Sequence, residues 1–122
     1  MKTRAFSCTE EGAIAAQAFL ESVCPSPRPM VVLDEIVSNI VRCSGASGFS
    51  IGLVDLGGSG IEMVFSDDGA PFDPTGDVEI PDITAGVEER EIGGLGIFMV
   101  KKMSKSVKYV REVGRNVLTV VM

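Results

Sequence analysis

Three short motifs, far apart in the chain, combine residue types that could bind and use a phosphorylated ligand. They are a carboxylate and an amide one helical turn apart, an aspartate followed closely by a glycine, and two glycines separated by one residue. The residues concerned are Glu35 with Asn39, Asp67 with Gly69, and Gly94 with Gly96. Carboxylate and amide oxygens suit a proton acceptor and a magnesium ligand, and glycine N–H groups suit phosphate. Together these groups could hold Mg-ATP and act on it.

The first motif lies in an amphipathic stretch. Apolar residues recur there at helical spacing and predict a core-facing stripe, whereas Glu35 and Asn39 share the polar face. Asn39 could supply one of the few protein oxygens that a nucleotide-bound Mg²⁺ takes. Glu35 could accept a proton from an attacking hydroxyl or water, or orient it, as phosphoryl transfer requires. An ordinary helix with one wet side is the alternative interpretation.

The second motif follows a strand-like segment. An ionised aspartate only accepts hydrogen bonds, so Asp67 could take one from the exocyclic amine of adenine. Guanine carries a carbonyl at that place and would be rejected. Gly69 would let the base approach the backbone closely. A plain turn after a strand is the alternative interpretation.

The third motif, Gly94 and Gly96, would offer backbone N–H groups and the positive end of a helix to phosphate oxygens. It completes neither the dinucleotide-binding glycine fingerprint nor a P-loop. Two further residues could touch the nucleotide. Arg90 could bind the γ-phosphate, or it could pair with the glutamates beside it in its loop. Thr119 could reach the adenine edge through water, although a threonine is also an ordinary strand residue.

Hydrophobic periodicity and turn residues predict the elements that position these motifs. Thr9 followed by two glutamates marks a helix start, and prolines separate that helix from the next one. The predicted strands cover residues 3–8, 49–56, 61–66, 106–110 and 117–121. The predicted helices cover 10–23, 29–43 and 95–104, and the apolar part of the first begins at residue 13. Residues 70–93 show no sustained period and contain many prolines, glycines and acids, which predicts a long loop.

The order of these elements places strands in sequential pairs with helices between them. This order predicts an α+β two-layer sandwich, in which a mixed, largely antiparallel sheet carries its helices on one face. At 122 residues and 45% hydrophobic content, the chain can fill one core. We therefore expect a single domain over residues 1–122.

Composition excludes several other activities. The chain has no histidine, so it cannot phosphorylate itself on histidine, and most zinc sites are ruled out. A net charge of −6 disfavours direct nucleic-acid binding. Cys8, Cys24 and Cys43 show no metal-ligand spacing and are odd in number, which indicates thiols in a reducing compartment. The apolar runs are too short for a membrane span or a signal peptide, so we expect a cytoplasmic protein without a membrane partner.

Together the motifs resemble those of the GHKL ATPase superfamily, which includes gyrase and histidine kinases. Within it they are most similar to the anti-sigma-factor serine kinases of bacterial partner-switching systems, also at residues 70–74 and 115–119. The resemblance covers nearly the whole chain and implies ATP and Mg²⁺ as cofactors. By this resemblance, Glu35 is the catalytic base, Asn39 the Mg²⁺ ligand and Asp67 the adenine ligand, and Gly94 and Gly96 bracket the phosphates under a lid over residues 74–93. One departure is Cys43, which stands where the family often has a histidine.

The resemblance implies a protein-serine kinase that acts as an anti-sigma factor. Such a protein sequesters a sigma factor, phosphorylates a serine of an antagonist protein, and forms a homodimer. A catalytically silent nucleotide-binding module, which chooses protein partners by nucleotide state, is an alternative from a different class. An ATPase domain acting on a partner's histidine would normally come with a histidine-bearing dimerisation helix, which this sequence lacks. An α+β domain without nucleotide is the plainest alternative.

Overall fold

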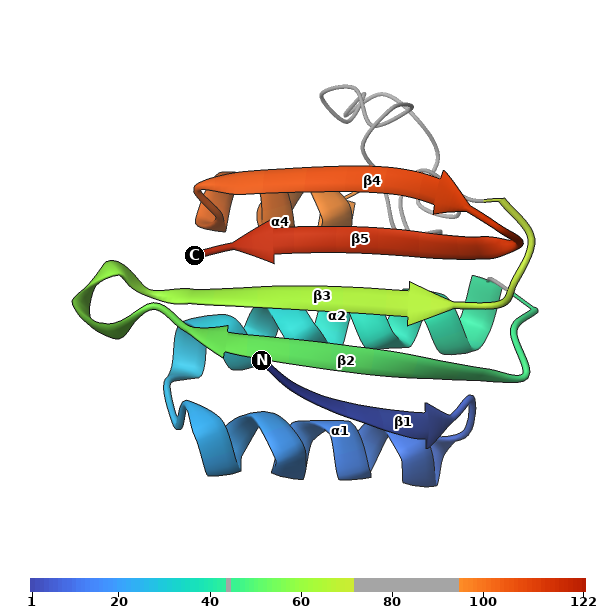
Figure 1. Ribbon diagram of the computed structural model, residues 1–122, viewed down its shortest axis with the longest axis horizontal. Helices are drawn as coiled ribbons and strands as arrows, with labels where there is room; N and C mark the ends of the chain where they lie inside the picture. The colour runs from blue at the N-terminus through green and yellow to red at the C-terminus, as the bar shows by residue number, and fades with distance from the viewer. Residues whose placement is uncertain (44, 72–94) are drawn as a thin grey trace.

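The computed structural model describes residues 1–43, 45–71 and 95–122, which form one sheet with helices behind it (Figure 1). The five strands are ordered β1-β2-β3-β5-β4, and every neighbouring pair is antiparallel. They are β1 Lys2–Ser7, β2 Gly48–Asp55, β3 Ile61–Asp67, β4 Ser106–Glu112 and β5 Arg115–Val121. Because β3 is central, a residue at its end has a neighbouring strand on both sides.

Three α-helices lie within the described residues: α1 Glu10–Val23, α2 Pro27–Cys43 and α4 Leu95–Met103. The Oγ1 atom of Thr9 caps α1 by accepting a hydrogen bond from Gly12 N at 3.1 Å. Gly12 also lets α1 begin close to the end of β1, because a Cβ atom there would lie 1.8 Å from the backbone oxygen of Ser7. The path from β1 into α1 therefore depends on both the cap and the glycine.

The core lies between the sheet and the helices that cover one of its faces (Figure 1). Helix α2 buries the apolar stripe that its period predicts, namely Leu33, Ile36, Val37 and Ile40. Strand β3 alternates buried and half-buried residues, as expected for a sheet with one covered face. Its buried row is Ile61, Met63, Phe65 and Asp67. Asp67 therefore points to the same side of the sheet as the helices.

Strands β4 and β5 are joined by a turn of two residues, Val113 and Gly114. Both have positive φ angles, 43° and 75°. Two successive positive φ angles are the mark of a type I′ hairpin turn, whose twist matches that of the flanking strands. The tight turn extends both strands and brings Arg111 opposite Asn116.

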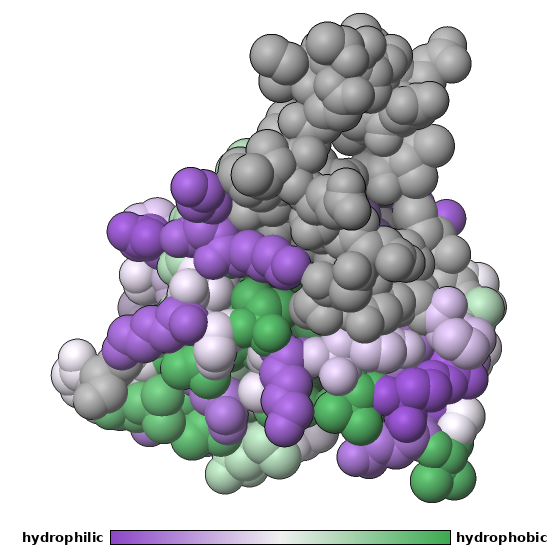
Figure 2. All heavy atoms as spheres, turned by 90° about the horizontal axis from the view of Figure 1, so that it is seen from above, coloured by the Kyte–Doolittle hydropathy of each residue, from purple (hydrophilic) through white to green (hydrophobic). Residues whose placement is uncertain are grey.

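Strand β4 forms one edge of the sheet. Its sequence includes the charged residues Lys108, Arg111 and Glu112. Charges on an edge strand discourage pairing with the edge of another molecule. Figure 2 looks onto this edge and shows hydrophilic side chains beside apolar ones.

The predicted α+β sandwich is confirmed, with a sheet that is antiparallel at every described pairing. Helix α1 begins at Glu10 with Thr9 as its N-cap, as predicted. The final strands are longer than predicted because their turn takes only two residues. Most of the predicted loop, from residue 72 to residue 93, lies outside the described residues. None of the described helices is long and apolar enough to cross a membrane.

Candidate nucleotide-binding site

The last residue of β3, Asp67, is a buried carboxylate with 5% of its surface exposed. Its Oδ1 atom accepts a hydrogen bond from Gly69 N at 2.9 Å and another from Asn116 Nδ2 at 3.0 Å. No group in the described parts of the chain donates to its Oδ2 atom. A carboxylate held through one oxygen can use the other as an acceptor for a ligand.

Asn116, near the start of β5, is the main side-chain partner of Asp67. The two residues are directly opposite each other in the register of β3 and β5, and Asn116 is also buried. Its Nδ2 atom donates a second hydrogen bond to Ala70 O at 2.8 Å. Its Oδ1 atom accepts hydrogen bonds from the Tyr109 hydroxyl at 2.6 Å and from Arg111 Nη1 at 3.2 Å. None of the three sequence motifs contains Tyr109, Arg111 or Asn116, and none of these residues was predicted as a site residue.

The structure corrects the predicted placement of Thr119. Side chains alternate along a strand, so Thr119 and Asn116, three residues apart, point to opposite faces of the sheet. Thr119 pairs with Val64, which belongs to the outward row of β3, and not with Asp67. The place beside the Asp67 carboxylate therefore belongs to Asn116. An asparagine within an apolar strand, in step with the buried Leu118, was the signal that could have identified it.

The turn after Asp67 is held from two sides. Arg111 Nη1 donates to Gly69 O at 2.8 Å. The Asp68 carboxylate accepts hydrogen bonds from Ser47 N at 2.9 Å and from Ser47 Oγ at 2.5 Å. The hydroxyl hydrogen bond and then the backbone one lower the pKa of Asp68. The turn that contains Gly69 is thus tied to β4 and to the segment that precedes β2.

Asn39 and Glu35 share the polar face of α2, as predicted. Asn39 is buried, with 6% of its surface exposed, and its Nδ2 atom has no hydrogen-bond partner among the described residues. A buried polar group without a partner costs about 1–3 kcal/mol, and an absent water, ion or ligand is a usual reason for finding one. The end of α2 and the end of β3 lie at the same end of the molecule (Figure 1).

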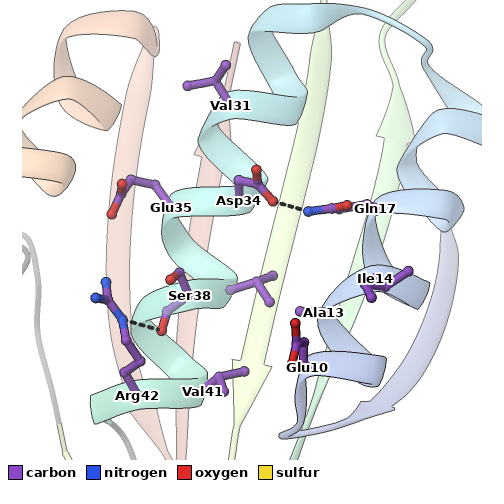
Figure 3. Close-up of a pocket in the computed structure, with 11 residues that line it drawn as sticks. Glu10, Ala13, Ile14, Gln17, Val31, Asp34, Glu35, Ser38, Val41 and Arg42 are labelled. Carbon is purple, nitrogen blue, oxygen red and sulfur yellow. Dashed lines mark hydrogen bonds between the residues drawn. The ribbon is translucent and has the colours of Figure 1, made fainter.

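Glu35 is half-buried and lies on the side of α2 that faces away from α1 (Figure 3). A groove of about 590 Å³ runs between α1 and α2, and Glu35 lines its rim. Gln17 Nε2 of α1 donates to Asp34 Oδ1 across this groove (Figure 3). No described residue bonds to the Glu35 carboxylate.

The remaining predicted residues lie at or beyond the edge of the described segments. Arg90, Gly94 and the lid over residues 74–93 fall outside them. Gly96 is the second residue of α4, which begins at Leu95 as predicted. Their contacts with a nucleotide stay predictions. Within the described residues, no group of three or more histidines, cysteines, aspartates or glutamates is placed to hold a metal ion.

The antiparallel sheet, with a buried carboxylate at the end of its central strand and a polar face on α2, defines the class of protein as an ATPase domain of the GHKL type. Over residues 14–122 the chain matches a family described as histidine kinase-like ATPase domain. The chain belongs to this family. No curated protein matches the chain. Family membership makes ATP the expected nucleotide, and it leaves the reaction and the partners to be proposed.

Proposed function

We propose that this domain binds Mg-ATP and transfers the γ-phosphoryl group to a serine of another protein, as an anti-sigma regulatory kinase. One observation carries the nucleotide-binding part of the proposal. Asp67 is buried at the end of the central strand, its Oδ1 atom is held by two donors, and its Oδ2 atom has none among the described residues. A fixed acceptor of this kind suits the amine of adenine and disfavours the carbonyl of guanine.

The amide of Asn39 fits the metal ion that accompanies the nucleotide. Its nitrogen is buried without a partner in the described structure, so the side chain has hydrogen-bonding capacity left for a ligand. Its Oδ1 atom would bind Mg²⁺, and its Nδ2 atom would donate to a water or phosphate oxygen. One protein oxygen is enough because Mg²⁺ takes its remaining ligands from phosphates and water. When bound, the ion would neutralise charge that develops on the phosphates.

Glu35 would act as the general base for transfer. Its carboxylate would take the proton of a serine hydroxyl while the serine oxygen forms a bond to the γ-phosphorus. The bond from the γ-phosphorus to the β–γ bridging oxygen breaks at the same time, and ADP leaves. The half-exposed position of Glu35 on the rim of the α1–α2 groove supports this role, since a protein substrate must be able to reach the base.

The partners belong to the proposal. They are a sigma factor, which the domain would sequester, and an antagonist protein, whose serine it would phosphorylate. Support comes from the resemblance of residues 70–74 and 115–119 to the anti-sigma kinases. The same resemblance supports a homodimer, which sedimentation analysis of the purified protein would detect.

The first experiment is a calorimetric titration of Mg-ATP and Mg-GTP into the wild-type protein, the Asp67→Asn variant and the Asp55→Asn variant. Asp55 lies at the other end of the β2–β3 pair and serves as the matched control. We expect saturable ATP binding to the wild type and the control, at least about tenfold weaker binding of GTP, and loss of ATP binding in Asp67→Asn. No binding at millimolar ATP would refute the proposal.

Transfer is tested next, with candidate antagonist proteins incubated with Mg-ATP and analysed by mass spectrometry. A phosphoserine that forms with the wild type and not with Glu35→Gln supports the kinase. ATP binding without transfer to any antagonist would instead favour the silent module that selects its partners by nucleotide state.

A further inference from the structure

We propose that Asn116 is a positioning residue that fixes the Asp67 carboxylate and so sets selectivity for the amine of the nucleotide base. Tyr109 and Arg111 hold Asn116 in place, and we call these three residues the amide clamp. The inference rests on the proposed nucleotide site. It adds residues from β4 and β5 that are outside the three sequence motifs.

The orientation of the Asn116 amide is determined by its neighbours. Its nitrogen faces two acceptors, Asp67 Oδ1 at 3.0 Å and Ala70 O at 2.8 Å. Its oxygen faces two donors, the Tyr109 hydroxyl at 2.6 Å and Arg111 Nη1 at 3.2 Å. A flipped amide would place its nitrogen against the Arg111 donor and its oxygen against the Asp67 and Ala70 acceptors, so only one orientation satisfies all four contacts.

The clamp also joins three strands at the end of the sheet. Arg111 Nη1 bonds to both Asn116 Oδ1 and Gly69 O, so one guanidinium nitrogen holds the amide and the turn together. Arg111 lies on the exposed edge strand, whereas Asn116 is buried. The clamp therefore connects the surface of β4 to the buried carboxylate at the end of β3.

This arrangement decides which oxygen of Asp67 can meet a ligand. Gly69 N and Asn116 Nδ2 both donate to Oδ1, which leaves Oδ2 as the acceptor for a base amine. Without Asn116, the carboxylate would be held by Gly69 N alone and could rotate about its last torsion. Recognition of the amine should then weaken more than binding of the rest of the nucleotide.

The test compares Mg-ATP with the Mg complex of purine riboside triphosphate, which lacks the amine. By calorimetry we expect the wild type to prefer ATP by about 10- to 100-fold, the usual effect of one hydrogen bond to a charged group. Asn116→Ala should reduce this preference to about threefold or less, with affinity for the analogue within about threefold of wild type. Tyr109→Phe and Arg111→Gln should give intermediate preferences.

The control is Val117→Thr, a substitution of similar volume at the next residue of β5, whose side chain points to the opposite face. It should keep the wild-type preference. A role in folding alone would weaken binding of ATP and analogue equally, and circular dichroism would show whether each variant is folded. If Asn116→Ala does not fold, Tyr109→Phe and Arg111→Gln decide, and an unchanged preference in both would overturn the inference.

Failure of the inference and failure of the proposed function give different results. A wild type that binds neither nucleotide overturns the nucleotide site, and the clamp then has no base to select. A wild type that prefers ATP, together with a folded Asn116→Ala variant that keeps the same preference, overturns the clamp and leaves the nucleotide site in place.

Discussion

Three buried polar side chains stand out among the described residues: Asn39, Asp67 and Asn116. Burial of a polar group is unfavourable unless the group finds a partner. Asp67 and Asn116 bond to each other, and the Asn39 nitrogen has no partner in the described structure. An amide nitrogen and a carboxylate oxygen that have no partner within the described segments are features that folding alone does not favour. At the residue scale, they are the strongest indication of a ligand site.

Replacement of Glu35 tests its role as a base. Glu35→Gln keeps the size of the side chain and removes its capacity to accept a proton. We expect Mg-ATP affinity within about twofold of wild type and a transfer rate lower by about 10²- to 10⁴-fold, the usual contribution of a general base. Single-turnover phosphorylation of the antagonist protein measures the rate. A Glu35→Gln variant that transfers at the wild-type rate would exclude Glu35 as the base.

The contact between Asp68 and Ser47 predicts a dependence of stability on pH. Hydrogen bonds from Ser47 lower the pKa of Asp68 in the folded state, so the ionised form stabilises the fold. This contribution is complete above the unfolded-state pKa and is lost as the pH falls through the lower folded-state pKa. We expect Asp68→Asn to be less stable than wild type at pH 7. The difference should shrink below about pH 4. Urea unfolding at several pH values measures it, and a constant difference down to pH 2 would contradict this account.

At the element scale, the β4–β5 turn holds a residue that is poorly suited to its conformation. Val113 is fully exposed and has a φ angle of 43°, a region that β-branched residues rarely adopt. Asn-Gly is the favoured pair for a type I′ turn. We expect Val113→Asn to raise the free energy of unfolding by about 1 kcal/mol, measured by urea denaturation. Val113→Ile, which stays β-branched, is the control and should not stabilise. Equal stabilisation by both variants would mean that backbone strain is not the cause.

How much of each element could be predicted depends on how local its signal is. The apolar stripe of α2 and the bounds of β2 and β3 follow from local patterns, and both were predicted almost to the residue. The placement of Thr119 was wrong because strand register depends on partners distant in the chain. The opposition of Asp67 and Asn116 joins residues far apart in sequence, and the hydrogen bonds of Tyr109 and Arg111 follow from that register. The second motif predicted Asp67. The residues that support it became evident only from the pairing of the strands in the folded sheet.

At the scale of the whole molecule, the proposed site lowers the stability of the nucleotide-free protein and favours nucleotide binding. The buried, unpartnered nitrogen of Asn39 is unfavourable in the nucleotide-free protein. A ligand that binds the folded state and satisfies this side chain should stabilise the whole domain. The stabilisation is about 2.7 kcal/mol at a ligand concentration one hundred times the dissociation constant. Replacing Asn39 with an apolar residue should therefore raise the free energy of unfolding without ligand and weaken nucleotide binding.

Asn39→Leu tests this opposition in a single variant. Leucine has a similar volume and no polar group, so the free energy of unfolding without nucleotide should rise by about 1–2 kcal/mol. The further stabilisation that Mg-ATP gives to the wild type should largely disappear, because the variant has no oxygen for Mg²⁺. Thermal and urea unfolding with and without Mg-ATP measure both effects. Chelation of Mg²⁺ should reduce the stabilisation of the wild type by ATP to the small value expected for the variant.

A variant that is destabilised without nucleotide would show that the Asn39 amide already has partners in the folded domain. Full stabilisation of the variant by Mg-ATP would exclude Asn39 as the magnesium ligand.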